Sequence, residues 1–225
     1  FTIEQSDCAM KVGTDGCLLG GWFNCSDSKR VLDIGCGTGL ITIMAAQRSN
    51  AEITGIEIDS KAAMQARINA DNSPWGERIT IIHGDLLQYT TENRFDTIVS
   101  NPPYFVNSLK CDDTSRTLAR HSDSLDCRQF FKKCAELLNS NGRVSIVIPC
   151  DIMNEWKTAA LELNLHPART TFIKTTPKKA AKRVLIEFRF NTQDENKEST
   201  LVLENSPGEY SDDAKRILSD FYLKL

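Results

Sequence analysis

The sequence is poor in the residue patterns that mark metal-binding and secreted proteins. Its three histidines have no ligand spacing, and its eight cysteines form no C-x-x-C pair. We therefore expect no metal site, and we expect the thiols to stay reduced. His121 is the one histidine beside a segment that could close over a substrate, although its surroundings equally fit a solvated loop.

Long apolar runs and an excess of basic charge are also missing. No stretch approaches the roughly 20 apolar residues of a membrane-spanning helix, and the opening residues lack the charge and apolar run of a secretory signal. These features predict a cytoplasmic protein that makes no membrane contact. The formal net charge of −3 argues against a protein that coats nucleic acid, but an enzyme needs only a local basic track.

The chain has 225 residues, of which 40% are hydrophobic, and this is enough for the core of one domain. We see no repeat and no second domain, and we favour a monomer. The domain divides into an N-terminal segment (1–29), a core (30–190) and a C-terminal part (191–225), in which a charged, solvated loop at 191–198 precedes a segment that packs back on the core. A polar stretch between Tyr104 and Asp123 is longer than an ordinary connection, so we expect a mobile substrate lid there.

Apolar runs of strand length alternate with segments of helical periodicity along most of the chain. The alternation predicts an α/β fold with a doubly wound, mainly parallel, seven-stranded sheet. The last two strands, which a short connection joins, are expected to form an antiparallel pair at the edge. We expect strands from Val31 and at 52–57, 79–83, 95–100, 143–148, 166–173 and 183–190, and helices at 39–48, 60–71, 126–139, 152–163 and from about 212.

The first expected strand runs into a glycine-rich turn with the pattern Asp33-x-Gly35-x-Gly37-x-Gly39. Glycines let the backbone approach a ligand closely. A dinucleotide fingerprint has the spacing G-x-G-x-x-G, and here the third glycine comes one residue early. Asp33 would repel a pyrophosphate, whereas it would attract the ammonium group of S-adenosylmethionine directly or through water. The pattern therefore favours the methyl donor over NAD.

Two further carboxylates lie at the ends of the next two expected strands. Glu57 follows the glycine turn by roughly twenty residues, where a carboxylate can accept hydrogen bonds from both ribose hydroxyls. Asp85 is placed to accept a hydrogen bond from an adenine amino group, and Asp59 is expected to cap the next helix. Either site carboxylate alone fits a solvated turn, but their shared position beside the glycine turn favours a cofactor site.

The tetrad Asn101-Pro102-Pro103-Tyr104 directly follows an apolar run, at the carboxyl end of a strand, where open α/β sheets bind ligands. The prolines preset the backbone geometry because they fix φ and carry no N–H group. If the Asn101 side-chain oxygen and the Pro102 carbonyl each accept one N–H of a planar amine, they favour a pyramidal nitrogen that can attack a methyl group. Tyr104, with Phe105, would stack on a planar substrate. Alone, the tetrad also fits a structural Pro-Pro turn.

Taken in order, these motifs resemble those of class I S-adenosylmethionine-dependent methyltransferases that methylate exocyclic or amide nitrogens. The match spans about residues 30–150. Other segments are more specifically similar to the bacterial tRNA1(Val) adenine-N6 methyltransferase family. They are Phe1-Thr2, residues 8–22, Arg120-His121 and residues 220–224. Cys17 and Cys36 stand where apolar or varied residues are more usual, and neither disturbs the chemistry.

The resemblance implies a Rossmann-like class I fold, S-adenosylmethionine as cofactor, and methyl transfer to the N6 atom of an adenine in tRNA, adenine 37 of tRNA1(Val). In the superfamily the segment before the first strand encloses the methionine end of the cofactor. The resemblance places this role on Lys11, Val12 and Thr14. Together with the motif residues, the expected cofactor-binding set is Lys11, Val12, Thr14, Asp33, Gly35, Gly37, Glu57, Asp85 and Asn101.

An RNA substrate would need basic side chains near the tetrad. The connection between the last two expected strands supplies a run of them, and a solvated lysine-rich turn is the alternative interpretation. The candidate substrate-binding residues are Pro103, Phe105, Arg120, Lys178, Lys179, Lys182 and Arg183.

Other functions remain open at this point. The same tetrad occurs in enzymes that methylate a glutamine amide of a protein, and in enzymes that methylate DNA or rRNA bases. Those enzymes usually carry a separate recognition domain, for which this chain has no room. A non-catalytic RNA-binding protein with this fold is a further alternative, although the intact carboxylates and tetrad argue against it.

Overall fold

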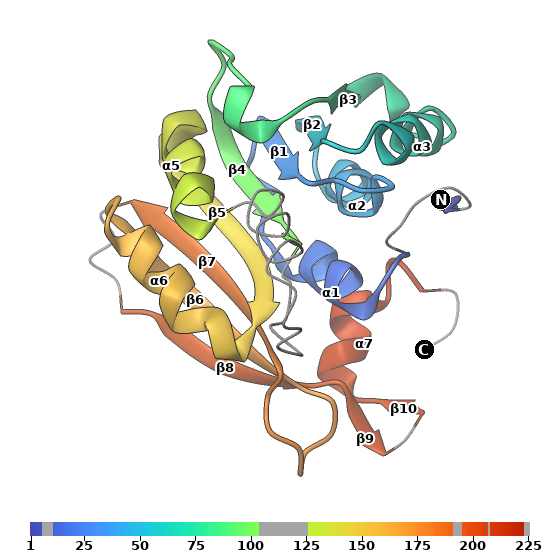
Figure 1. Cartoon of the computed structure of the whole chain (residues 1–225). Coiled ribbons are helices and arrows are strands. Elements are labelled where there is room, and N and C mark those ends of the chain that lie inside the picture. Colours follow the sequence, from blue (N-terminus) through green and yellow to red (C-terminus); the bar gives the residue numbers. More distant parts are fainter. Residues whose placement is uncertain (6–10, 104–125, 191–194, 207, 223–225) are drawn as a thin grey trace, which may run out of the picture.

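An eight-stranded sheet with helices on both faces forms the centre of the molecule (Figure 1). The structure is a computed structural model that describes residues 1–5, 11–103, 126–190, 195–206 and 208–222. The strands are β1 (Arg30–Ile34), β2 (Glu52–Glu57), β3 (Ile79–His83), β4 (Phe95–Ser100), β5 (Leu138–Pro149), β6 (Leu165–Lys174), β7 (Arg183–Phe190), β8 (Lys197–Val202), β9 (Glu204–Ser206) and β10 (Glu209–Tyr210). The helices are α1 (Thr14–Trp22), α2 (Leu40–Arg48), α3 (Ser60–Asp71), α5 (Cys127–Leu137), α6 (Met153–Leu161) and α7 (Asp212–Leu218), with short 3-10 helices η1 (Gly76–Arg78), η2 (Leu86–Gln88) and η3 (Cys150–Ile152).

The sheet has the strand order β3-β2-β1-β4-β5-β7-β6-β8, and β9 and β10 pair separately. Neighbours from β3 to β5 are parallel, and β7 runs antiparallel to both β5 and β6. The doubly wound, mainly parallel sheet and the antiparallel β6–β7 pair are therefore confirmed.

The expected number of seven strands is wrong, because β8 pairs with β6 and lies at the edge instead of the β6–β7 pair. The expected solvated loop is likewise wrong at Lys197 and Glu198, which begin this strand. In β8 only Leu201 is buried, so the strand depends on main-chain pairing with β6 and has no apolar alternation that the sequence could reveal.

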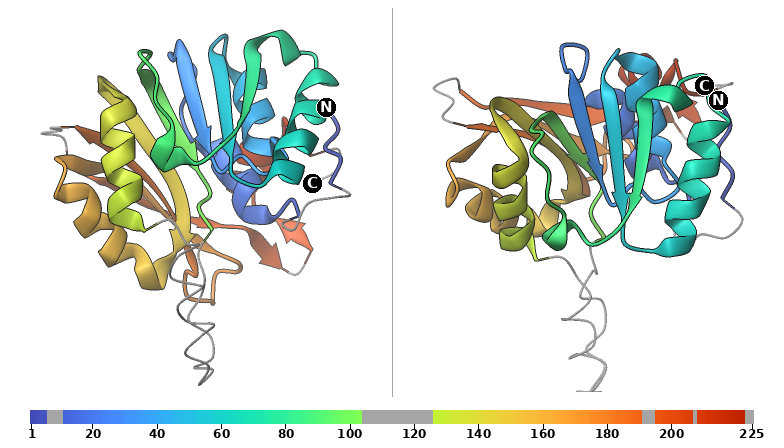
Figure 2. Two further views of the ribbon diagram at one scale, coloured as in Figure 1. Left: turned by 45° about the horizontal axis from the view of Figure 1, so that its top comes forward. Right: turned by 90° about the horizontal axis from the view of Figure 1, so that it is seen from above.

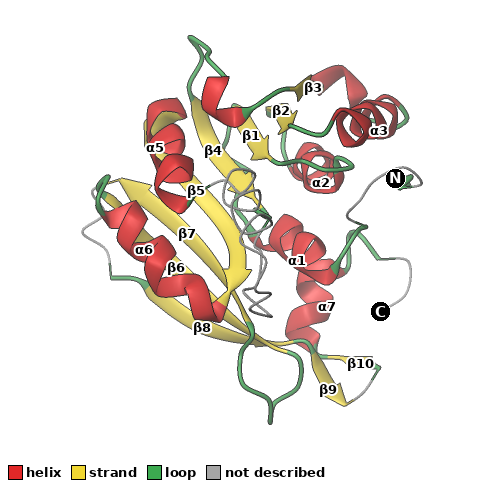
Figure 3. Cartoon of the chain, in the orientation of Figure 1, coloured by secondary structure: helices red, strands yellow, loops and turns green. Residues whose placement is uncertain are grey.

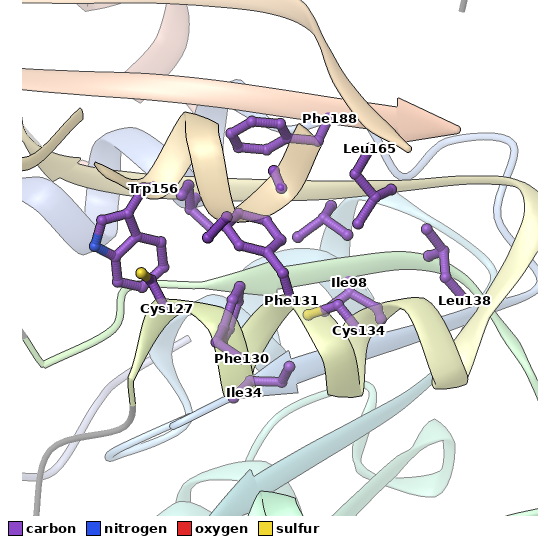
Figure 4. Close-up of a cluster of buried hydrophobic side chains, with 14 of the residues drawn as sticks. Ile34, Ile98, Cys127, Phe130, Phe131, Cys134, Leu138, Trp156, Leu165 and Phe188 are labelled. Atoms are coloured by element: carbon purple, nitrogen blue, oxygen red, sulfur yellow. The ribbon is translucent and has the colours of Figure 1, made fainter. Parts of the chain in front are cut away.

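The two faces of the sheet are covered by different helices (Figures 2 and 3). Helices α5 and α6 pack on one face, where Phe130, Phe131, Trp156 and Phe188 form an aromatic cluster (Figure 4). The Phe131 and Phe188 rings meet edge to face with centroids 5.0 Å apart. Helices α1, α2 and α7 pack on the other face around Val31, Ile53 and further buried residues of the sheet. Covering both faces explains why the central strands are nearly continuous apolar runs.

Helix α1 was not expected from the sequence, which marked residues 1–29 only as a covering segment. Its sequence TDGCLLGGW contains three glycines and has no polar face, because most of its residues are buried. Two of the glycines permit close helix packing: a Cβ atom at Gly20 would collide with the Met44 side chain of α2, and one at Gly21 with the Ile217 carbonyl of α7. Tertiary packing thus favours this helix despite its low intrinsic propensity.

Candidate active site

The glycine-rich turn between β1 and α2 has an open side that a ligand can approach. Gly35, Gly37 and Gly39 have φ values of 67°, 55° and 83°, in the left-handed region that favours glycine. The turn is tied to β2, because the Gly35 and Cys36 amides both donate to the Ile56 carbonyl, at 2.8 and 3.1 Å. A Cβ atom at Gly35 or Gly37 would meet no atom within 4 Å. The backbone here can therefore be approached closely from outside.

Asp33 lies beneath this turn and is only 1% exposed. Its Oδ2 atom accepts a hydrogen bond from the Thr42 hydroxyl at 2.6 Å, while its buried Oδ1 atom has no partner among the described residues. Burial raises the pKa of this carboxyl from 3.8 to about 7; the Thr42 hydrogen bond opposes the rise, and the negative charge of Glu57 adds to it. A buried carboxylate with an unpartnered oxygen would be stabilised by a cation, as the predicted role requires.

Glu57, at the end of β2, is held against the glycine turn. Its Oε2 atom accepts from the Gly37 amide at 2.8 Å, and its Oε1 atom accepts from the Asp59 amide at 2.9 Å. Because a carboxylate has about four acceptor positions, two remain for hydroxyl donors of a ligand. Asp59 caps α3 as expected, since its side chain accepts from the Ala62 amide at 2.8 Å.

Asp85 follows β3 and begins the short helix η2. Its Oδ1 atom accepts from the Leu87 amide at 2.9 Å, so the side chain has a capping role that the sequence did not suggest. Its Oδ2 atom has no hydrogen-bond partner among the described residues. This oxygen remains able to accept from an amino group, and the predicted position at the strand end is the one observed.

Asn101 follows β4, and its side chain points toward α1. Its Nδ2 atom lies 4.0 Å from the place where a Cβ of Gly16 would be, and its Oδ1 atom is buried with no partner among the described residues. The preceding residue, Ser100, is fixed to β1 because its hydroxyl donates to the Ile34 carbonyl at 2.8 Å. Pro102 is buried and Pro103 is exposed. The strand end is thus tied to β1, and the Asn101 amide oxygen is left for a donor from outside the described residues.

The N-terminus of α1 faces the same region. Lys11, Val12 and Thr14 are exposed around it, and Gly13 is an N-cap without a side-chain hydrogen bond. Amide groups in the first turn of a helix lack intrahelical partners and favour a negatively charged group. The segment is therefore suited to a ligand carboxylate beside the tetrad.

Comparison with known proteins identifies the family. The methyltransferase small domain family model matches residues 12–159. Over the full chain, the sequence is 46% identical to a tRNA1(Val) (adenine(37)-N6)-methyltransferase of Bacteroides fragilis, of which 96% is covered. It is 42% identical to the protein of that name from Aeromonas hydrophila, with 100% of this chain and 95% of the relative covered. The chain belongs to the tRNA1(Val) (adenine(37)-N6)-methyltransferase family.

Solved structures agree with this family assignment at the level of the fold. A predicted O-methyltransferase from Agrobacterium tumefaciens superposes with a TM-score of 0.74 at 18% identity, covering 92% of this chain and 96% of that chain. A glycopeptide N-methyltransferase complexed with S-adenosyl-L-methionine superposes with a TM-score of 0.59 at 15% identity, covering 81% of this chain and 90% of that chain. The class I methyltransferase fold is thus confirmed.

In this member of the tRNA1(Val) methyltransferase family, the predicted basic residues divide into two groups. Lys178, Lys179 and Lys182 are exposed in the β6–β7 connection. Because Pro149 and Arg183 are register partners, this connection lies at the carboxyl edge of β5, on the same side as the tetrad. The three lysines therefore form an exposed basic group on the side of the sheet where the tetrad lies.

Arg183 has a different environment from these lysines. Its Nε atom donates to the Asp15 carboxylate at 2.8 Å, joining the start of β7 to the first turn of α1. This ion pair gives Arg183 a structural role that the sequence did not suggest. Several expected site residues lie outside the described residues, namely Tyr104, Phe105, Arg120, His121 and the remainder of the predicted lid, 106–123.

Two apolar side chains beside the site were missed by the sequence analysis. Ile58, directly after Glu57, is 69% exposed, and Leu87, two residues after Asp85, is 39% exposed. Large aliphatic side chains at the ends of buried strands normally turn inward. An apolar residue shortly after each acidic strand end was the signal available in the sequence.

Among the described residues, no group of three or more His, Cys, Asp or Glu side chains could hold a metal ion. In the same part of the chain, no helix is long and apolar enough to cross a membrane.

Proposed function

We propose that this protein transfers a methyl group from S-adenosylmethionine to the N6 atom of adenine 37 in tRNA1(Val). The observation that carries the proposal is the buried, unpartnered Oδ1 atom of Asn101 at the carboxyl end of β4. An acceptor in that position fits an exocyclic amino group. The substrate is inferred from relatives that are 42–46% identical over the whole chain and carry the name of this activity.

The residues around the glycine turn fit the parts of this cofactor. The unpartnered Asp33 oxygen suits its ammonium group, and Glu57 has acceptor positions for the ribose hydroxyls. Gly35 and Gly37 leave open space where the backbone would be approached. Lys11 and Val12, just before α1, and Thr14, its first residue, would cover the methionine end, where the helix amides favour a carboxylate.

The adenine of the cofactor would lie near the ends of β2 and β3. Asp85 has one carboxylate oxygen available for the adenine amino group. The exposed Ile58 and Leu87 side chains offer apolar surface for the flat faces of the ring. Covering this surface with a base would lower the apolar area that the protein exposes to water.

When bound, S-adenosylmethionine supplies an electrophilic methyl group. The N6 lone pair of the target adenine would take this methyl group as the C–S bond electron pair leaves on sulfur, and the N6 proton would pass to water. Asn101 Oδ1 and the Pro102 carbonyl accept the two N–H groups, which orients the lone pair and stabilises the positive charge that develops on nitrogen. Tyr104 and Phe105 would stack on the extruded base, and Pro103 would contact its edge.

The decisive experiment is to incubate the protein with methyl-labelled S-adenosylmethionine and total bacterial tRNA, followed by nucleoside analysis. We expect label in N6-methyladenosine, and in tRNA1(Val) when single tRNAs are tested. Label in a protein glutamine, in DNA or in rRNA would redirect the proposal to those substrates, and tRNA binding without label would favour a non-catalytic role. A tRNA substrate also implies a cytoplasmic location for this protein. We further propose that it acts as a monomer, because one chain contributes all the proposed site residues.

The three exposed lysines of the β6–β7 connection, with Arg120, are proposed to bind RNA phosphates. Replacing Lys178, Lys179 and Lys182 together by alanine should raise KM for tRNA while leaving kcat and the affinity for S-adenosylmethionine nearly unchanged. The logarithm of the tRNA association constant decreases linearly with the logarithm of the salt concentration. In the triple variant this slope should become less steep by roughly 0.7–0.9 for each phosphate that the protein no longer binds. The control is the double variant Lys29→Ala with Lys197→Ala. These exposed lysines lie at the amino ends of β1 and β8, on the opposite side of the sheet from the β6–β7 connection. Equal effects of the two sets would contradict a local binding track.

A further inference from the structure

Asn69, on α3, joins the N-terminus of the described chain to the glycine turn. Its side chain is 2% exposed and makes three hydrogen bonds. Oδ1 accepts from the Glu4 amide at 3.0 Å, and Nδ2 donates to the Glu4 carbonyl at 2.9 Å and to the Thr38 carbonyl at 2.9 Å. Both amide hydrogens and one oxygen are therefore used. The Glu4 backbone is held at both its donor and its acceptor by one side chain.

Residues 1–5, which we call the N-terminal strap, have few other attachments. The Phe1 ring contacts Trp75 edge to face with centroids 6.1 Å apart, but Phe1 is still 45% exposed. Gln5 Oε1 accepts from the Val12 amide at 2.7 Å, which links the strap to the segment before α1. No residue of the strap is fully buried. Segments with little buried apolar surface open easily, so the Asn69 hydrogen bonds are a large part of what holds the strap in place.

The other end of this connection is part of the cofactor site. Thr38 lies between Gly37 and Gly39, and the Gly37 amide is the one that donates to Glu57. Helix α3 also packs directly on the turn, since a Cβ atom at Gly39 would contact the Ala66 Cβ at 3.4 Å. A change at Asn69 would therefore act both on the strap and on the turn that faces the ligand.

We propose that Asn69 is a positioning residue that couples docking of the N-terminal strap to the conformation of the glycine turn, and so increases the affinity for S-adenosylmethionine. The inference rests on the proposed use of that cofactor. Asn69 itself touches no reacting atom. It holds the Thr38 carbonyl directly, and it holds the Glu4 backbone, next to Gln5, whose side chain accepts from the Val12 amide. Because these groups are ordered before the ligand arrives, less entropy is lost on binding.

The first test measures binding of S-adenosylmethionine to the full chain by calorimetry, together with thermal stability. Asn69→Ala removes all three hydrogen bonds, while Asn69→Asp keeps the volume but replaces the two donors by acceptors facing two carbonyls. We expect both to weaken binding about tenfold, which corresponds to about 1.4 kcal/mol. The matched control is Gln47→Ala: Gln47 Nε2 donates to the Asp220 carbonyl at 3.1 Å, a similar side-chain contact to the other terminus at the far end of α2. That variant should bind like the unmodified protein.

Deleting residues 1–5 provides a second, independent variant. If strap and turn are coupled through Asn69, the deletion should also weaken binding, and combining it with Asn69→Ala should weaken it by less than the sum of the two effects. In hydrogen exchange without ligand, the Glu4 and Val12 amides should exchange faster in Asn69→Ala. KM for tRNA should change little in any of these proteins.

Several results would overturn the inference. Unchanged affinity in Asn69→Ala and Asn69→Asp would show that Asn69 does not position the turn, and strictly additive effects with the deletion would remove the coupling. An equal loss in Gln47→Ala, or a parallel rise in KM for tRNA, would indicate general destabilisation instead. If the unmodified protein bound no S-adenosylmethionine, the proposed function itself would fail. Measuring the unmodified protein therefore separates a failure of the proposed function from a failure of the Asn69 inference.

Discussion

Replacing Asn101 with alanine should reduce kcat by about 10²–10³-fold, the size of effect seen when one preorganised polar group is removed from a transition state. Affinity for S-adenosylmethionine should stay within a few-fold, because the cofactor contacts we propose are made mainly by the turn between β1 and α2 and by Glu57 and Asp85. The measurement is single-turnover methyl transfer to tRNA at saturating cofactor, with binding measured in parallel. Unchanged turnover would remove Asn101 from the mechanism.

The stability of this variant provides an internal control. In the absence of ligand, Asn101 Oδ1 is buried without a partner among the described residues, so removing it relieves an unsatisfied polar group. The free energy of unfolding should therefore be unchanged or slightly higher. A companion variant, Gly16→Ala, places a methyl group 4.0 Å from Asn101 Nδ2 and 3.5 Å from Leu40, both ordinary contacts, and should retain most activity. A fall in activity without a fall in stability would indicate a chemical role for Asn101.

Most of the sheet could be predicted from local sequence. Strands β2, β3, β4 and β7 have the expected bounds, because each is rich in apolar residues. Strands β4 and β7 are mostly buried, whereas in the edge strand β3 only Ile81 is buried. The same reasoning predicted the site at the carboxyl edge, since the acidic or amide side chains follow strands of known direction. The strand predictions are confirmed, and the side chains expected at the strand ends lie there; their roles in a site stay a prediction.

The missed features depend on contacts between distant parts of the chain. Strand β8 has mainly exposed residues and is fixed by pairing with β6. Arg183 belongs to a basic run, yet its partner Asp15 lies 168 residues away. Asn69 is one of several polar residues in an expected helix, and nothing local shows that it meets the Glu4 backbone. No short pattern in the sequence carries this information.

Replacing Asp33 with asparagine should make the ligand-free protein more stable, by an amount that depends on pH. The carboxyl has a pKa of about 7 in the folded protein and 3.8 when unfolded, because burial disfavours its charged form. Between these values the unfolded state binds fewer protons, so stability falls as pH rises from about 4 through 7. The decrease in stability is at most about 4 kcal/mol by the usual conversion. Asparagine cannot ionise, so Asp33→Asn should lack this fall.

Urea unfolding at pH 5 and pH 8 tests this prediction. At pH 5 the Asp33 carboxyl is mostly neutral in the folded state but already ionised in the unfolded state, so the variant should be moderately more stable than the unmodified protein. At pH 8 the carboxyl is ionised in both states, and the difference in stability should be clearly larger. The same difference at both pH values would contradict a raised pKa, and would attribute the change to the Thr42 hydrogen bond instead. Oδ1 of Asp33 has no hydrogen-bond partner among the described residues. Contacts around this atom should therefore contribute little to the pH dependence of the stability difference between the two proteins.

Cofactor affinity should respond to the same substitution in the opposite direction. The ammonium group is attracted to the ionised carboxylate, so binding of S-adenosylmethionine to the unmodified protein should strengthen as pH rises through about 7. Asp33→Asn should bind it at least tenfold more weakly at pH 8, about 1.4 kcal/mol or more, with little pH dependence in this range. Glu57, whose oxygens are held by the Gly37 and Asp59 amides, would remain as the ribose acceptor in both proteins. A carboxylate that is costly in the ligand-free fold and useful only when a cation arrives is what a binding residue, unlike a structural one, should show.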